Sequence, residues 1–400
     1  MKSFNPELFR QQFPALKEAG CYLDSAATAL KPLALIKATE EYYAHNSATV
    51  HRSAHTAAQH ATALFENARV LAAKHLNAAS HQQIIWTKGT TEAINLVAQS
   101  YARPRLKPND EIIVTGSEHH SNLIPWLMVA QQTGAKVVRL PLNNLFMPDL
   151  TQLPPLLNEK TRILAIGQMS NVTGGSPDLH HAIKLAHDNG TIVMVDGAQG
   201  VVHAPPDVQK LDVDFYAFSA HKLYGPTGIG VLYGKAALLD DMVPWQGGGK
   251  MLTQASFSGF IPQSVPECFE AGTPNIAGVI GIGAVLSWLS AQDIADAERY
   301  ACGLAQAAYD QLSSITGFIS YRVPDSSLLA FNIDGYHHSD IATLLSEQGI
   351  AIRAGQHCAQ PLLDAMGVSG TLRASFAPYN QLTDVDRLYN ALTQALSLLE

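Results

Sequence analysis

The chain has 400 residues, of which 47% are apolar and 15% are charged, and this composition excludes a disordered, collagen-like or coiled-coil protein. The length suggests two or three domains of roughly 150 residues, or one large domain with a smaller one beside it. With 34 acidic and 26 basic residues the net charge is −8, so we expect no general basic surface for nucleic acid or an anionic membrane.

The apolar segments and the cysteines predict a cytoplasmic protein. The first 20 residues contain no apolar run typical of a signal peptide, and the longest apolar stretch, residues 276–289, is shorter than the roughly 20 residues that span a bilayer. The cysteines are far apart and form no Cys-x-x-Cys pair, so we expect neither a disulfide framework nor a metal site. They are Cys21, Cys268, Cys302 and Cys358.

Short β-rich runs alternate with stretches of helical length between residues 83 and 234. The runs are apolar nearly throughout, which indicates a mainly parallel seven-stranded sheet with helices on both faces. In such a sheet ligands bind outside the carboxyl ends of the strands. The predicted strands are residues 84–87, 111–115, 136–140, 162–168, 191–197, 215–220 and 228–234, with helices between them such as residues 91–101, 122–132 and 177–189.

The pattern changes after residue 234. Residues 246–274 are rich in Gly, Ser and Pro and are predicted as a loop, and a long helix is predicted over residues 276–312. Further on, strands are predicted at 327–333, 350–354 and 372–376, with helices at 339–348 and from residue 384 onward. We therefore predict a large α/β domain over residues 21–275 and a smaller α+β domain formed by residues 1–20 with residues 276–400.

Two neighbouring strand ends carry the residues with the clearest chemistry. Asp196 closes one apolar strand and is followed by Gln199, whereas Lys222 follows the next strand. Taken alone, the Asp has an ordinary explanation as a helix cap and the Lys as a solvated surface residue. Together they are what pyridoxal 5'-phosphate (PLP) requires, because a lysine forms a Schiff base with PLP and a carboxylate keeps its pyridine nitrogen protonated.

The sequence around these residues resembles the cysteine desulfurases of the class-V aminotransferase group, which are fold-type I PLP enzymes. The resemblance rests on VDGAQG (195–200) with SAHKLYGPTGIGVLYG (219–234), and on matches in the expected order along nearly the whole chain. These are YLDSAATALKP (22–32), VHRSAH (50–55), GTTEAINLVA (89–98), EHHSNLIPW (118–126), MSNVTG (169–174), EAGTPN (270–275) and RAGQHCAQPLL (353–363). The compact Arg-x-Gly-x-His-Cys setting of Cys358 resembles group II, and Gln356 with Gln360 is similar to the cysteine sulfinate desulfinase branch.

The resemblance implies the residues that bind the cofactor. Lys222 is expected to bind PLP covalently and to shuttle the proton at the substrate Cα, while Asp196 pairs with the pyridine nitrogen and Gln199 contacts the phenol oxygen. His119 is expected to stack on the ring and to be catalytic, since an imidazole can also take and give protons near neutral pH. Thr90, Thr91, Ser219 and His221 are implied phosphate ligands, and Thr273 is expected to reach the phosphate of the partner subunit, which implies a homodimer.

The resemblance also implies the substrate site and the reaction. Asn171 and Arg373 would hold the substrate carboxylate, and Arg353, His55 and His357 are further expected substrate contacts. Cys358 is expected to take sulfur from L-cysteine, leaving alanine and a persulfide that passes to a SufE-like acceptor protein for iron–sulfur cluster biogenesis. L-cysteine sulfinate and L-selenocysteine are the other expected substrates.

Two alternative functions remain at this point. Another class-V enzyme, such as a small-molecule aminotransferase or a kynureninase-like hydrolase, would share Lys222 and its neighbours but would not need Cys358. A protein that only docks sulfur carriers would fold and bind its partners without binding PLP. The combination of Asp196, Lys222 and Cys358 favours the desulfurase.

Overall fold

A computed structural model describes residues 4–399, and its centre is a seven-stranded sheet in the order β2-β8-β7-β6-β5-β3-β4. Six strands run in one direction, and only β8 is antiparallel to its neighbours β2 and β7. All seven predicted strands are confirmed. Their bounds are β2 Ile84–Thr87, β3 Glu111–Thr115, β4 Lys136–Leu140, β5 Thr161–Gly167, β6 Ile192–Asp196, β7 Phe215–Ser219 and β8 Gly230–Gly234.

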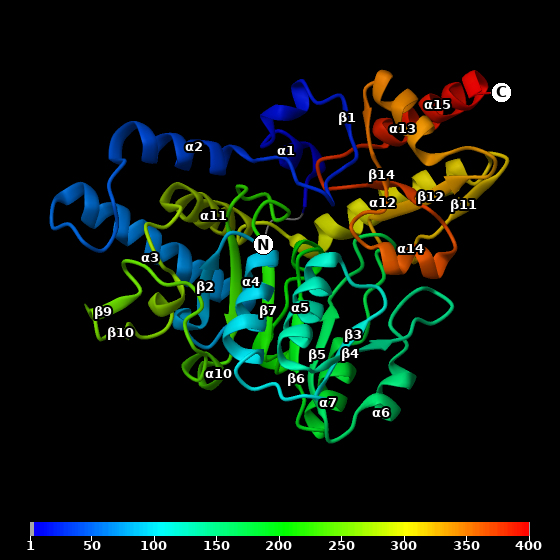
Figure 1. The fold of residues 1–400 in the computed structure, drawn as a ribbon. Coiled ribbons are helices and arrows are strands. Elements are labelled where there is room, and N and C mark those ends of the chain that lie inside the picture. Colours follow the sequence, from blue (N-terminus) through cyan, green and yellow to red (C-terminus); the bar gives the residue numbers. More distant parts are fainter. Residues whose placement is uncertain (1–3, 400) are drawn as a thin grey trace.

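Helices cover both faces of this sheet, because successive side chains of each strand point to opposite faces and nearly all of them are apolar. Val195 and Phe218 pack on the face covered by α3 (Thr56–Leu76), α7 (Leu179–Asp188) and α11 (Ile276–Leu289). Met194 and Phe215 pack on the other face, covered by α4 (Thr90–Leu96), its continuation η4 (Val97–Ala102), α5 (Ile124–Thr133) and α10 (Ala236–Asp240). The result is a three-layer α/β unit (Figure 1).

A second, antiparallel sheet lies beside the first and has the order β11-β12-β15-β14. Its strands are β11 Phe318–Ser320, β12 Leu328–Ile333, β14 Arg353–Gly355 and β15 Thr371–Ser375. The helices of this part of the chain are α12 Ile294–Leu312, α13 His338–Glu347, α14 Gln360–Met366 and α15 Leu382–Leu399. The strand predicted at 350–354 is divided, because β13 (Ile350–Ala351) pairs with β1 (Cys21–Tyr22) whereas β14 pairs with β15.

The prediction of one helix over residues 276–312 was wrong, because two helices, α11 and α12, meet there at 89°. The Asp293 side chain accepts the N–H of Asp296 and so caps the start of α12. Glycines in α11 allow close helix packing: a Cβ at Gly283 would lie 2.7 Å from the Cβ of Ala68 in α3, and one at Gly281 would lie 2.5 Å from Leu35 in α2 (Leu33–Glu41). In the described part of the chain no single helix has the length and hydropathy to cross a membrane, and α11 with α12 reaches them only as this bent pair.

The predicted domain boundary at residue 275 stays a prediction. We propose that it lies after α11, because α11 packs in the core of the large sheet. Cys21 and Leu23, in contrast, pack in the core of the smaller unit with α12 and α15. The remaining short helices are α1 Pro6–Arg10, η1 Pro14–Lys17, η2 Tyr42–Asn46, η3 His81–Gln83, η5 His120–Asn122, η6 Leu150–Gln152, α6 Leu153–Leu156, α8 Gly200–His203, α9 Val208–Leu211 and η7 Glu267–Phe269.

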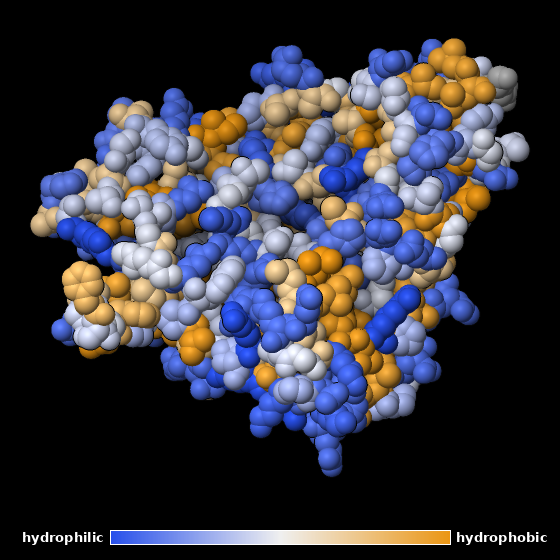
Figure 2. Space-filling view, viewed as in Figure 1, coloured by the Kyte–Doolittle hydropathy of each residue, from blue (hydrophilic) through white to orange (hydrophobic). Residues whose placement is uncertain are grey.

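The stretch predicted as a loop, residues 246–274, contains a β-hairpin formed by β9 (Leu252–Ser256) and β10 (Gly259–Pro262). The hairpin projects from the molecule at the left of Figure 1. Phe257 at its turn is fully exposed, and Phe260 and Ile261 are more than half exposed, so apolar side chains gather at this edge (Figure 2). An apolar surface of this kind is typical of a contact with another protein.

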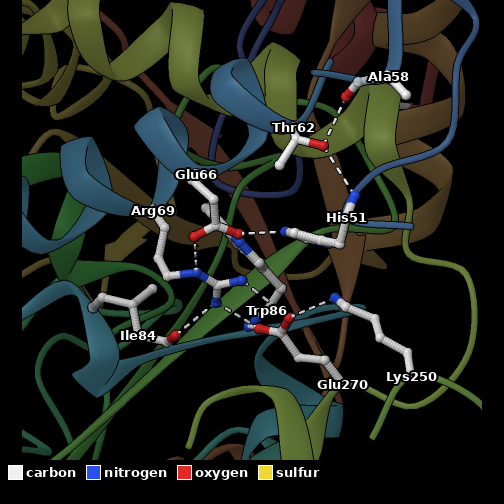
Figure 3. Close-up of polar contacts among 9 residues, drawn as sticks. All are labelled: His51, Ala58, Thr62, Glu66, Arg69, Ile84, Trp86, Lys250 and Glu270. Atoms are coloured by element: carbon white, nitrogen blue, oxygen red, sulfur yellow. Dashed lines mark hydrogen bonds and ion pairs between the residues drawn. The ribbon is translucent and has the colours of Figure 1, made fainter. Parts of the chain in front are cut away.

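A buried ion network holds the base of this segment on α3 (Figure 3). The Arg69 guanidinium donates two hydrogen bonds to Glu270, at 2.6 and 3.1 Å, and Lys250 Nζ lies 3.2 Å from the same carboxylate. Arg69 Nε also donates to Glu66, which in turn lies 2.9 Å from His51 Nε2. Removing one partner of such a buried pair typically lowers the free energy of unfolding by about 3–5 kcal/mol. The network therefore fixes the position of Glu270 and of the residues that directly follow it.

Candidate active site

A cavity of about 230 Å³ lies at the carboxyl ends of the strands of the large sheet, where the smaller unit covers them. The residues that line it come from both units, so the site exists only when the two are packed together. Thirteen of the predicted site residues line this cavity: Thr90, Thr91, His119, Asn171, Asp196, Gln199, Ser219, His221, Lys222, Arg353, His357, Cys358 and Arg373.

Asp196 and Lys222 face the cavity from neighbouring strand ends. Asp196 is the last residue of β6 and is 8% exposed, and its carboxylate accepts the N–H of Ala198 at 2.9 Å. Burial raises the pKa of Asp196, although Ala198 and Lys222 oppose this shift. Burial lowers the pKa of Lys222 to about 8, against the opposing effect of Asp196. The Lys222 amine is therefore far easier to deprotonate than an exposed lysine, as a nucleophile and base must be.

One end of the cavity is formed by the start of α4 together with the residues after β7. Thr90 N donates to Ser219 Oγ at 2.8 Å, and the two side-chain hydroxyls hydrogen-bond to each other at the same distance. The N-cap residue Gly89 has no side chain to cap the helix, so the N–H groups of Thr91 and Glu92 remain available to an anion, and the Thr91 hydroxyl, which hydrogen-bonds to Ser121 Oγ at 2.8 Å, lines the same corner. This corner is suited to a phosphate group.

His119 lies in the cavity wall immediately before η5. Its Nδ1 accepts the N–H of Ser121 at 3.1 Å, so the ring proton is on Nε2. Burial, with a further contribution from the positive charge of Lys222, lowers the pKa of His119 to about 4. The imidazole is therefore neutral at pH 7, which suits stacking against a flat ring.

Arg373 lies in β15 and brings a positive charge into the cavity from the smaller unit. Its guanidinium donates to the Asn171 carbonyl oxygen at 2.7 Å and to Asp24 Oδ1 at 3.2 Å. Its Nε is buried and has no hydrogen-bond partner among the described residues. Burial lowers the pKa of Arg373 to about 10, so the group still carries its charge at neutral pH. A buried, incompletely paired guanidinium is a ready binding group for a carboxylate.

The loop between β14 and α14 carries Cys358 into the cavity. Both His357 and Cys358 have left-handed backbone conformations, with φ of 52° and 56°. Three hydrogen bonds hold the loop on the large unit: His120 N to the Cys358 carbonyl at 2.7 Å, Gln360 N to His120 Nε2 at 3.2 Å, and Asn171 Nδ2 to the His357 carbonyl at 2.8 Å. Cys358 is nevertheless exposed, whereas the other cysteines are at least half buried. Its thiol is thus the accessible one.

The ring of His357 is not a source of positive charge in the cavity. Its Nε2 lies 2.9 Å from the hydroxyl of Thr371, and burial together with the charge of Arg373 lowers the pKa of His357 to about 3. The imidazole is neutral at pH 7 and supplies no positive charge to Cys358. Arg353 and Arg373 supply the positive charge in this part of the cavity.

His55 and Thr273 are predicted site residues that do not line this cavity. His55 is exposed and caps α3 by accepting the N–H of Ala58. Thr273 is exposed on the rim of a second cavity of about 490 Å³, beside Trp86 and Trp245. Within a single chain, neither residue is brought to Lys222.

Comparison with known proteins identifies the family. Residues 21–388 match the sequence family described as aminotransferase class-V. The chain belongs to the class-V aminotransferase family. It is 63% identical over 399 residues to the cysteine desulfurase CsdA of Escherichia coli K12, with full coverage of both chains.

Solved structures agree with this assignment. The crystal structure of E. coli CsdA superposes with a TM-score of 0.96 at 62% identity, covering 99% of this chain and 100% of that one. The apo cysteine desulfurase of Thermococcus onnurineus superposes with a TM-score of 0.94 at 34% identity and the same coverage. The predicted fold-type I architecture is confirmed.

PLP is the cofactor of this class-V family, and the residues of the cavity fit it. Lys222 offers an amine of lowered pKa, and the Asp196 carboxylate receives only one hydrogen bond from the described residues, so an oxygen remains for the pyridine nitrogen. The hydroxyls of Thr90, Thr91 and Ser219 gather at the anion corner. The buried, unpartnered Nε of Arg373 further indicates a bound anion on the substrate side.

Glu118 is a residue of this class-V site that the sequence reasoning missed. It is 4% exposed in the cavity wall and accepts hydrogen bonds from the Thr115 hydroxyl, from Asn122 Nδ2 at 2.6 Å and from Gly167 N at 2.7 Å. Burial raises its pKa to about 7. Glu118 therefore ties the end of β3 to the end of β5 and fixes the loop that carries His119. The only sequence signal was its place in the EHHSN motif, directly before that histidine.

Proposed function

We propose that this chain is a PLP-dependent cysteine desulfurase that converts L-cysteine to L-alanine and carries the sulfur as a persulfide on Cys358. The observation that carries the proposal is the accessible thiol of Cys358 in the same cavity as Lys222, Asp196 and Arg373. An aminotransferase or a kynureninase-like hydrolase needs the latter three groups but no such thiol. The 63% identical cysteine desulfurase of E. coli supports the same conclusion.

Some side chains of the cavity are assigned to binding, and Lys222 is assigned to proton transfer as well. When bound, PLP links covalently to amines and withdraws electrons from the substrate Cα. Lys222 would hold the cofactor through its amine and, once that amine is free, would take the proton from the substrate Cα. Asp196 would keep the pyridine nitrogen protonated, and His119 would offer its neutral ring for stacking. Arg373, with Asn171, holds the substrate carboxylate.

Sulfur transfer is assigned to Cys358. The thiolate Sγ attacks the substrate sulfur, so that an Sγ–S bond forms as the Cβ–S bond breaks, and Cβ takes a proton to complete alanine. Arg353 lines the cavity together with this thiol and brings a positive charge to that part of the site. The exposed position of Cys358 also suits delivery of the persulfide sulfur to a SufE-like acceptor, in the cytoplasm, for iron–sulfur cluster biogenesis.

Cysteine sulfinate and selenocysteine are proposed as further substrates. Both have the carboxylate that Arg373 would bind, and the same amine and Cα proton as L-cysteine. Sulfite is released from the sulfinate without a thiol acceptor, and the C–Se bond is weaker than C–S. These two substrates therefore depend less on Cys358.

Incubation of the purified holoenzyme with L-cysteine is expected to give alanine and a persulfide on Cys358. The measurement is alanine by chromatography together with mass spectrometry of the peptide that contains Cys358. Alanine formed with an equal amount of pyruvate consumed, and no persulfide, would instead support an aminotransferase. A protein that binds no PLP at all would support the docking function.

We also propose that the enzyme is a homodimer in which Thr273 completes the site of the partner subunit. Thr273 is exposed and lies outside the cavity of its own chain, yet the Arg69–Glu270 pair holds its loop in place. The exposed apolar side chains of the β9–β10 hairpin, in the same segment, provide surface for a second copy (Figure 2). His55, also exposed outside its own cavity, is proposed to contact substrate in the partner.

Thr273→Val is expected to weaken PLP binding about tenfold or more, since it removes one hydrogen bond to a charged group. The dissociation constant of PLP is measured by absorbance, with Thr393→Val, an exposed threonine on α15, as the matched control. In heterodimers, Thr273→Val should weaken the site that carries Lys222 on the opposite chain. Weak binding only at the site of the mutated chain itself, or a fully active monomer in sedimentation, would contradict the shared site.

A further inference from the structure

A line of hydrogen bonds leads away from Lys222 through three side chains. Lys222 Nζ lies 3.5 Å from Gln199 Oε1, and Gln199 Nε2 lies 2.9 Å from Nε2 of His203, at the end of α8. His203 Nδ1 lies 2.8 Å from Oε1 of Glu298 in α12. His203 and Glu298 do not line the cavity of the active site, and their side chains are only 12% and 19% exposed.

The line of contacts determines which atoms carry protons. With Gln199 Oε1 facing the lysine amine, its Nε2 faces His203 and must donate. His203 Nε2 therefore accepts, so its proton is on Nδ1 and is donated to Glu298. An inverted Gln199 amide would place two donors against each other at Lys222. Each contact is thus consistent with a single orientation of the amide.

Glu298 is well suited to hold this tautomer. Its Oε1 also accepts from Ser327 Oγ at 3.0 Å and from Cys302 Sγ at 3.4 Å. Burial acts to raise the pKa of Glu298, but the contacts with His203 and Ser327 outweigh it and the net pKa lies below the ordinary value. Glu298 is therefore an acceptor at neutral pH, and Nδ1–H of His203 has a fixed partner.

We propose that His203 and Glu298 are positioning residues that orient the Gln199 amide so that its second N–H is available to the phenol oxygen of PLP. The inference rests on the proposed function, since it assigns the ligand of Gln199. It also links the units, because Glu298 belongs to α12 of the smaller unit whereas Gln199 and His203 follow β6 of the large sheet. The hydrogen bond from Gln199 to PLP would then depend on α12 being packed correctly against the large unit.

A donor at the phenol oxygen has a measurable effect on the bound cofactor. It stabilises negative charge on that oxygen, and so lowers the pH midpoint at which the visible absorbance band of the enzyme-bound PLP titrates. The other charged or titratable groups around this site are unchanged in variants of His203 and Glu298. They are Asp24, Glu118, His119, Asp196, His221, Lys222, Tyr224, Cys302, Arg353, Cys358 and Arg373.

The test is a pH titration of the visible band in holoenzyme variants. His203→Ala is expected to raise the midpoint by about one pH unit, the size of one hydrogen bond to a charged group. His203→Gln should restore the wild-type midpoint, because its Oε1 can accept from Gln199 while its Nε2 donates to Glu298. Glu298→Leu should give a smaller rise, since Ser327 Oγ remains 3.2 Å from His203 Nδ1. His187→Ala, which removes a similarly ion-paired histidine from the opposite edge of the sheet, is the control and should leave the midpoint unchanged.

An unchanged midpoint in folded, PLP-loaded His203→Ala would overturn the inference, as would a failure of His203→Gln to restore it. If His203→Ala does not fold, Glu298→Leu decides the question, and an unchanged midpoint there overturns the inference. These outcomes differ from failure of the proposed function, which would appear as a wild-type protein with no PLP band.

Discussion

Lys222→Ala is expected to lower the rate of alanine release from L-cysteine by about 10⁴-fold or more, because one substitution removes both the covalent anchor and a general base that alone contributes about 10²–10⁴-fold. Lys222 is the amine of lowered pKa beside Asp196 in the cavity. The measurement is alanine release by the purified variant, with the fold checked by circular dichroism.

Lys31→Ala is the matched control for this variant. Burial also lowers the pKa of Lys31 to about 8, but its amine donates to the His221 carbonyl at 2.9 Å and does not line the cavity. Lys31→Ala should therefore keep most of the activity. If Lys222→Ala releases alanine at a rate comparable to that of Lys31→Ala, Lys222 is not the residue that binds the cofactor and moves the Cα proton.

Cys358→Ala is expected to separate the three substrates. Desulfuration of L-cysteine should fall by orders of magnitude, because the atom that receives sulfur is gone. Turnover of cysteine sulfinate and selenocysteine should stay within roughly tenfold of the wild type, which corresponds to about 1.4 kcal/mol of activation free energy. The measurement is kcat/KM for the three substrates, with alanine as the common product.

Cys268→Ala is the control for the loss of a thiol. Cys268 is buried in the core and its burial raises the thiol pKa to about 12, so it supplies no thiolate at neutral pH. Its substitution should leave all three activities in place. An equal loss on all three substrates in Cys358→Ala would show a structural or general-acid role for Cys358, and unchanged cysteine desulfuration would move the nucleophile to another thiol.

The sequence by itself determined the elements of the large sheet and the chemistry at its edge. Its strands are continuous apolar runs buried on both faces, and such runs are visible without any long-range contact. Asp196 and Lys222 could also be placed at neighbouring strand ends, because Asp196 is the last residue of β6 and Lys222 lies three residues after the end of β7. The PLP site was predictable because its main residues are tied to local structure.

Only the tertiary structure decided what depends on packing between distant segments. The break between α11 and α12 follows from close contacts of Gly281 and Gly283 with α2 and α3, which hold α11 on the large unit while α12 turns into the smaller one. The loop of Cys358 reaches the cavity through its hydrogen bonds with His120. Burial rather than residue type makes His357 neutral, and it likewise raises the pKa of Glu118. Local sequence encodes where a strand ends, whereas burial and contacts across two units arise only when the whole chain has packed.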